Sequence, residues 1–260
     1  MAIRTLFASI LLTLSFNVCA QTPEERGLEI AREMDHRNDG FVNSMHDATM
    51  TLKNRQGEES VRHFTLKTLE VTGDGDKELG LFDNPPDVRG TAVLTYSHGV
   101  EPDDQWIYLP SLKRVKRISS ANKSGPFVGS EFAFEDIASW QLDKFDYKYL
   151  RDETVDGGDC FVIEFLPKYD NSGYSKQIWF IDKVMYEARK TEYYDRKGDP
   201  FKTLFLKDHH QYLGRYWRAH DLLMENHQIG KTTRLLRDNY KFKTTLNERE
   251  FTAGALTSVR

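Results

Sequence analysis

Residues 160–182 read "CFVIEFLPKYDNSGYSKQIWFID", two apolar runs on either side of a turn signal. Side chains that would point to opposite faces of a strand are bulky and apolar in both runs: Phe161, Ile163 and Phe165 against Val162 and Leu166, then Ile178 and Phe180 against Trp179 and Ile181. A strand in a simple sandwich has one apolar face. Two apolar faces predict that both sides of the sheet are covered, or that one side lines a cavity.

The same two-residue period recurs along most of the chain after Asp47. It predicts strands around ten segments, namely 48–54, 62–71, 91–96, 105–110, 160–167, 176–182, 186–194, 202–208, 215–224 and 232–242. Turn signals separate them, namely 72–76, 83–87, 151–159, 170–173, 195–200 and 226–231. We therefore expect a mainly β protein with a few helices, whose antiparallel sheet curls strongly and so limits its exposed edges.

A helix is predicted before the strands. Thr22 is a suitable N-cap, Pro23 fits the first helical position, and Glu25 completes a capping box. Its apolar face would carry Leu28, Ala31 and Met34. Gly40 is expected to end it.

The first twenty residues, "MAIRTLFASILLTLSFNVCA", have the layout of a secretory signal peptide. Arg4 precedes an apolar run from Leu6 to Phe16, which is too short for a permanent membrane span. Cleavage after Ala20 would start the mature chain at Gln21, so we expect a signal peptide at 1–20, a single domain at 21–260 and a periplasmic location. The alternative, a lipoprotein attached through Cys19, is disfavoured because bulky Val18 precedes that cysteine.

The mature chain would keep Cys160 as its one cysteine, so no internal disulfide is expected. Cys160 lies in an apolar run and is interpreted as a small buried hydrophobe. Removing Arg4 with the leader changes the formal net charge from −4 to −4 − 1 = −5. An acidic chain of this kind is not expected to bind nucleic acid.

Motifs that carry catalysis or metal binding do not occur in this sequence: it has no HExxH, CxxC, GxSxG or phosphate-binding glycine loop. The pair His209 and His210 would point to opposite faces of a strand, and the acids of 72–80 do not follow EF-hand order. We expect no enzyme activity, no catalytic residue, no cofactor and no metal. A hydrolase with two separated carboxylates stays open, because sequence does not give their spacing.

Two neighbouring stretches, "QWIYLPSLKRVKRI" (105–118) and "GPFVGSEFAFEDI" (125–137), resemble the outer-membrane lipoprotein-sorting-protein family, the relatives of the periplasmic carrier LolA. The similarity extends from the helix near Leu28 to "EFTAGAL" at 250–256. It implies a half-open antiparallel β-barrel (LolA/LolB-like) with an apolar concave side, an N-terminal helix and a central helical plug. It also implies a lipid or acylated lipoprotein as cargo and an inner-membrane RND-type transporter as partner.

The residues themselves suggest how such a carrier would work. Residues 130–140 would form a hinged apolar lid, with Ser130 as helix N-cap and glycines 125 and 129 as hinges. The predicted ligand-binding residues are Trp106, Tyr108, Phe127, Phe132, Phe134, Ile137, Trp140 and Trp179. The predicted residues for docking to a membrane or an acidic partner, by transient contact, are Lys113, Arg114, Lys116 and Arg117.

The sequence thus favours a periplasmic carrier that shuttles acyl chains between an inner-membrane transporter and an acceptor. A lipid-sensing regulatory module on the same fold is the alternative from another functional class.

Overall fold

The computed structural model describes residues 21–258 of the chain. The predicted signal peptide at 1–20 lies outside these residues. Within the described part, no helix is both long enough and apolar enough to cross a membrane.

One antiparallel sheet contains all the strands of the described chain. Its strands are β1 (Asn43–Lys53), β2 (Glu59–Leu69), β3 (Lys77–Asn84), β4 (Ala92–Tyr96), β5 (Asp104–Leu109), β6 (Arg114–Ile118), β7 (Phe145–Val155), β8 (Gly158–Pro167), β9 (Tyr174–Asp182), β10 (Ala188–Asp195), β11 (Pro200–Tyr212), β12 (Tyr216–Asn226) and β13 (Lys231–Phe242). The helices are α1 (Pro23–Asn38) and α2 (Phe134–Ile137), with short 3₁₀ turns at Pro110–Leu112, Ser120–Asn122, Phe127–Gly129, Leu142–Lys144, Glu248–Glu250 and Ala255–Thr257.

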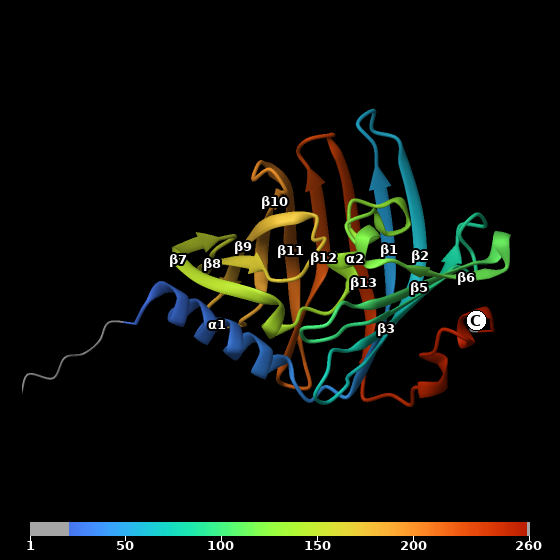
Figure 1. Cartoon of the computed structure of the whole chain (residues 1–260), viewed down its shortest axis with the longest axis horizontal. Coiled ribbons are helices and arrows are strands. Elements are labelled where there is room, and N and C mark those ends of the chain that lie inside the picture. Colours follow the sequence, from blue (N-terminus) through green and yellow to red (C-terminus); the bar gives the residue numbers. More distant parts are fainter. Residues whose placement is uncertain (1–20, 259–260) are drawn as a thin grey trace, which may run out of the picture.

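The order of the strands explains the shape of the molecule. The thirteen strands run β6-β5-β4-β3-β2-β1-β13-β12-β11-β10-β9-β8-β7, so every strand lies beside its sequence neighbour except at one place. That place is between β6 and β7, which form the two opposite edges of the open sheet. Residues 119–144, here called the bridging segment, connect these edges. They must therefore cross the space between the two arms of the sheet, where Figure 1 shows α2.

The ten predicted strands are all present, and the structure adds β3, β6 and β7. Strand β3 was missed because Glu78 and Gly80 interrupt the apolar alternation on the face that carries Phe82. Strand β7 was missed because its charged end, Arg151–Val155, was taken for part of a turn. The turn itself is only Asp156 and Gly157, both with positive φ, as a tight two-residue hairpin requires.

Helix α1 begins as predicted. The Thr22 hydroxyl accepts a hydrogen bond from Glu25 N at 3.1 Å, and the Glu25 carboxylate accepts one from Thr22 N at 2.9 Å. The helix lies against β7, and Gly27 allows this contact, since a Cβ there would lie 2.9 Å from the Lys148 and Tyr149 backbone nitrogens. Its buried side chains Ile30, Ala31 and Met34 pack into a cluster with the β7–β9 arm.

The C-terminal segment, residues 243–258, covers part of one face of the sheet at strands β3 and β4. Phe251 and Leu256 are each 1 % exposed and pack on Leu79, Ala92 and Leu94 of strands β3 and β4. The largest apolar cluster lies on the other face of these strands and includes Met50, Phe64, Phe82, Phe127, Phe132, Tyr193, Leu222, Met224 and Leu235. The bridging segment thus contributes to the main core of the protein.

Candidate functional site

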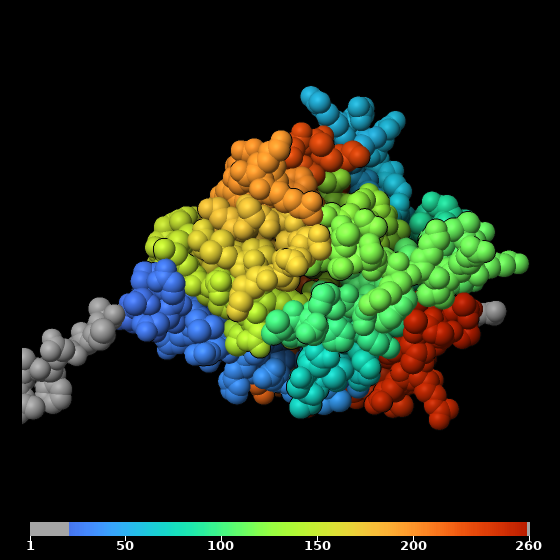
Figure 2. Space-filling view, viewed as in Figure 1, coloured from blue at the N-terminus to red at the C-terminus, as the bar shows by residue number. Residues whose placement is uncertain are grey.

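A cavity of about 890 Å³ lies between the sheet, α1 and the bridging segment. This volume is within the range of cavities that hold small molecules, roughly 300–1,000 Å³. Figure 2 shows the bridging segment, in green, between the β8–β9 part of the surface (yellow) and the β3–β5 part (teal). Access to the cavity from this side therefore depends on that segment.

One wall of the cavity is aromatic. The Trp140 and Trp179 rings lie 6.4 Å apart between centroids, and Trp179 stacks on Phe165 at 4.5 Å. Phe145 and Met34 line the cavity beside them. Flat, adaptable apolar surface of this kind suits the methylene groups of an alkyl chain.

The first half of the bridging segment is fastened to the central strands. Phe127 and Phe132 are 2 % and 4 % exposed, and a backbone hydrogen bond joins Phe127 N to Phe132 O at 2.7 Å. Glu131 makes three hydrogen bonds. Its carbonyl accepts one from Lys202 Nζ, its carboxylate accepts one from Asn226 Nδ2, and its N–H donates one to Thr233 Oγ1 at 2.9 Å. Strands β11, β12 and β13 therefore all hold this turn in place.

The second half is fastened to the two arms. Glu135 accepts hydrogen bonds from Ser172 Oγ at 2.9 Å and Gly173 N at 2.7 Å, and Asp136 accepts one from Tyr174 Oη at 2.9 Å. On the other arm, Gln105 Nε2 donates to the Phe134 carbonyl at 2.9 Å. Burial raises the pKa of both carboxyls, with their mutual repulsion adding to the effect at Glu135.

The predicted helix cap in this segment was wrong. Ser130 has an extended backbone, and its hydroxyl donates to the Phe127 carbonyl at 2.7 Å. Helix α2 begins only at Phe134, and the Asp136 carboxylate accepts a hydrogen bond from Ala133 N at 2.7 Å. After Ser130 the chain instead runs back beside Pro126, and Ala133 forms a β-bridge with it.

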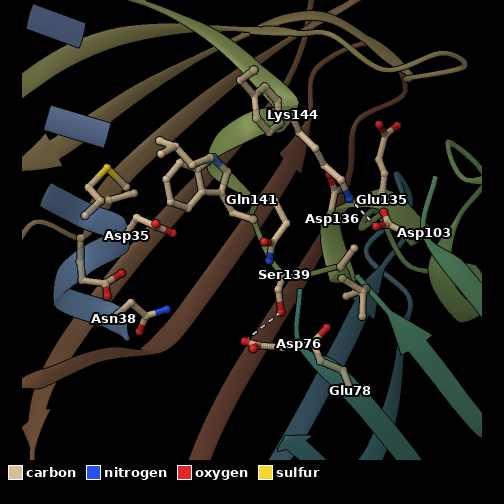
Figure 3. Close-up of a pocket in the computed structure, with 18 of the residues that line it drawn as sticks. Asp35, Asn38, Asp76, Glu78, Asp103, Glu135, Asp136, Ser139, Gln141 and Lys144 are labelled. Atoms are coloured by element: carbon tan, nitrogen blue, oxygen red, sulfur yellow. Dashed lines mark hydrogen bonds and ion pairs between the residues drawn. The ribbon is translucent and has the colours of Figure 1, made fainter. Parts of the chain in front are cut away.

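The other end of the cavity is polar. Figure 3 shows Asp35 of α1 and Asp76 and Glu78 near β3 pointing into the same space from opposite sides. Burial raises the pKa of Asp76 to about 6 and, with repulsion from Asp76, that of Glu78 to about 8. The wall between them includes His46, whose pKa burial and the nearby Arg237 lower to about 2, so its ring is neutral.

The predicted ligand-binding residues fall into three groups. Phe127, Phe132, Ile137, Trp140 and Trp179 line the cavity. Phe134 lies behind them, with its ring edge-to-face on Phe127 at 5.6 Å. Trp106 and Tyr108 belong to the opposite face of β5, where they pack in the cluster of Phe251 and Leu256. The alternation along β5 explains this difference, because Gln105 and Ile107 take the inward positions.

The four predicted docking cations are all exposed, at and before edge strand β6. They do not share one face. Lys116 pairs with Ile107 in register and Arg117 with Trp106, so their side chains point to opposite faces of the strand. Arg117 also forms an ion pair with Asp104.

The sequence analysis did not single out His46 and Arg237, and it treated Glu78 as part of an acidic turn. Each occupies an inward position of its strand: His46 alternates with Ala48 and Met50, and Arg237 pairs in register with Ala48. A polar residue within an apolar alternation was the signal that could have revealed them.

Cys160 and the pair His209 and His210 lie outside this cavity. Cys160 is fully buried among apolar side chains, as predicted, and burial raises the pKa of its thiol to about 11. His209 and His210 do separate, but His210 lies with Asp208 and His220 so that one ligand atom of each is within 4.8 Å of the others. Asp208 and His210 are exposed and His220 is half-buried, and the three have donor types that bind zinc.

Solved structures of similar proteins place the chain in a family. A domain described as an outer membrane lipoprotein-sorting protein from Vibrio parahaemolyticus is 51 % identical, with a TM-score of 0.88 over 90 % of this chain and 99 % of that one. A DUF1329 family protein from Desulfovibrio piger is 31 % identical, with a TM-score of 0.86 over 90 % and 99 % of the two chains. A LolA superfamily protein from Nitrosomonas europaea, 20 % identical with a TM-score of 0.69 over 87 % and 97 %, shares the fold.

The comparisons based on sequence cover less of the chain. A family model whose description is an uncharacterized protein matches residues 74–258. No curated protein matches at a significant level. With half of its residues identical over nearly the whole of the Vibrio domain, the chain belongs to the outer membrane lipoprotein-sorting protein family and has the mainly β, LolA-like fold.

Proposed function

We propose that this protein is a periplasmic carrier that holds acyl chains of a lipid or lipoprotein in its cavity and passes them between membrane-bound partners. The observation that carries this proposal is the cavity of about 890 Å³ with the aromatic wall of Trp140, Trp179 and Phe145. The similarity to a domain described as an outer membrane lipoprotein-sorting protein supports it, as does the fold shared with a LolA superfamily protein.

The energetics suit reversible carriage. Burial of an alkyl chain contributes about 0.8 kcal/mol per methylene group. A chain that is only partly enclosed would be held firmly enough for transit and still released to an acceptor with a larger apolar surface. No covalent chemistry is needed.

The bridging segment would be the lid of this carrier. It lines the cavity through Phe127, Phe132, Ile137 and Trp140, and it connects the two free edges of the sheet. Displacement of its second half would open the cavity while the Phe127–Phe132 turn stays packed in the core.

The basic run beside this opening would serve docking. Lys113, Arg114, Lys116 and Arg117 lie at the edge that adjoins the bridging segment, where they can meet acidic head groups or an acidic partner. We propose an inner-membrane transporter of the RND type as that partner, and export through the leader at 1–20.

Native mass spectrometry with lipid extraction tests the carrier function on protein purified from the periplasm. We expect an adduct with the mass of a lipid or acylated species, which organic solvent removes. Replacement of Trp179 by Ala should lower the adduct fraction, whereas Trp217→Ala, a substitution outside the cavity lining, should leave it unchanged. A protein that never carries an acyl species would refute the proposal.

A further inference from the structure

The polar end of the cavity contains side-chain atoms whose hydrogen-bonding capacity is unused. Among residues 21–258, buried atoms without a partner include His46 Nδ1, Glu78 Oε2 and Arg237 Nε, and all three residues line the cavity. His46 is 5 % exposed. Buried polar atoms are normally paired, so a cluster of unpaired ones in a single cavity indicates a ligand.

The charges of these atoms are of both signs. The Glu78 carboxylate is an acceptor when ionised, whereas Arg237 Nε is a cationic donor. Arg237 is close enough to lower the pKa of Glu78, yet these two side chains form no ion pair within the described chain. Burial keeps the Glu78 carboxyl protonated up to a pKa of about 8, and an ammonium group placed beside it would favour its ionised form, while Arg237 would pair with the anionic group of the same ligand.

The charged residues around Glu78 and those around Arg237 favour ligand groups of opposite charge. Asp76 lies beside Glu78 and raises its pKa, and Asp35 faces both from α1, so this side favours a cation. On the other side Arg237 lines the cavity, and Arg218 lies behind it, 3.7 Å from the Glu187 carboxylate. Two cations against one carboxylate leave this side favourable for an anion. The neutral ring of His46 lies where the two regions meet.

We propose that the cavity recognises the head group of a zwitterionic amphiphile, with its ammonium group at Glu78 and Asp76 and its phosphate or carboxylate at Arg237 and His46. This inference rests on the proposed carrier function and names its substrate class. The alkyl chain would extend toward the aromatic wall of Trp140 and Trp179. Phosphatidylethanolamine has this chemistry, as has any acylated molecule whose head combines an amine with an anion.

The test compares lipids that have identical short acyl chains and different head groups. Dihexanoyl phosphatidylethanolamine, dihexanoyl phosphatidylglycerol and dihexanoyl glycerol would be titrated into the full mature protein by calorimetry, together with glycerophosphoethanolamine, which has the head group alone. We expect the zwitterionic lipid to bind about tenfold or more tightly than the other two lipids, as expected for one charge-assisted hydrogen bond.

Two substitutions separate the contributions of the charges. Glu78→Gln should remove the advantage of phosphatidylethanolamine over phosphatidylglycerol, and Arg237→Gln should weaken both of these lipids relative to dihexanoyl glycerol. Exposed residues of the same strands provide matched controls, Asp83→Asn and Arg234→Gln, and should change neither ratio. Thermal melting of each variant confirms that it is folded.

The outcomes for the native protein are distinct. Equal binding of the three lipids, or tightest binding of phosphatidylglycerol, would overturn the zwitterion inference and leave the carrier proposal intact. Binding of glycerophosphoethanolamine without binding of any acylated lipid would support the head-group site and overturn the carrier. Absence of all binding would overturn both.

Discussion

At the scale of single residues, Glu78 has a carboxyl group whose ionised form is disfavoured by its surroundings. Glu78 is enclosed by protein, and burial together with repulsion from Asp76 raises its pKa from 4.5 to about 8, with Arg237 opposing. In the unfolded chain the same group ionises near pH 4.5. Between these two values the folded protein binds a proton that the unfolded chain does not, so stability falls as the pH rises.

Replacing Glu78 with Gln should therefore stabilise the empty protein at alkaline pH. The change in the Glu78 pKa corresponds to at most about 5 kcal/mol above pH 8, and to almost nothing below pH 4.5. Urea unfolding of both proteins at pH 4.5 and at pH 8.5 measures the difference, with Asp83→Asn as the exposed control. Parallel pH profiles of the native and Glu78→Gln proteins would show that this carboxyl is not responsible.

At the scale of elements, the bridging segment combines two parts with different burial. Phe132 is 4 % exposed and packs with the central strands, whereas Phe134 is only partly buried and lies at the start of the short helix α2. The first part is held by Lys202, Asn226 and Thr233. Elements that move for function come from the less stable regions of a structure, which favours the second part as the moving one.

Two truncations within this segment should consequently differ. Phe132→Ala should lower the free energy of unfolding by about 3 kcal/mol or more, because it leaves a hole in the main core. Phe134→Ala should leave the fold largely intact and speed the release of a bound fluorescent fatty acid. Calorimetric melting and fatty-acid release, measured side by side, decide the matter. A large drop in melting temperature with normal release in Phe134→Ala would make this residue ordinary core and argue against the lid.

At the scale of the whole molecule, the absence of pairing between β6 and β7 determines where the sheet is open. The sheet is continuous from β6 through β1 and β13 to β7, so the two free edges meet the bridging segment at one opening. The four cations predicted to serve docking lie at one of these edges. On strands β3–β5, the C-terminal segment covers the sheet face that points away from the cavity. Trp106 and Tyr108 pack against it there.

Charge at the rim should affect encounter more than retention. The fourfold change of Lys113, Arg114, Lys116 and Arg117 to Gln should slow fatty-acid transfer to anionic vesicles several-fold at low salt, with little effect at high salt, where screening already weakens attraction. Stopped-flow assays measure the rate of fatty-acid transfer, and lipid extraction measures how much lipid the purified variant holds. Unchanged transfer with lost lipid content would assign these residues to ligand binding instead.

The sequence by itself determined the elements whose signals are local. The capping box of Thr22 and Glu25 and the period-two runs of ten strands depend on neighbours within a few residues, and all of these are present in the structure. The double apolar faces around Phe165 and Trp179 left two alternatives, a sheet covered on both sides or a sheet that lines a cavity. The structure has apolar clusters on both sides of β8 and β9, and Trp179 lines the cavity.

Only the tertiary structure decided which polar residues share that cavity. His46, Glu78 and Arg237 come from strands β1, β3 and β13, far apart in sequence, and the pairing of the first strand with the last brings them to one wall. It also decided that Trp106 faces away while Ile107 faces inward, since a period of two leaves open which face is concave. Burial and Coulomb forces depend on distances through space, and no short stretch of sequence contains those distances.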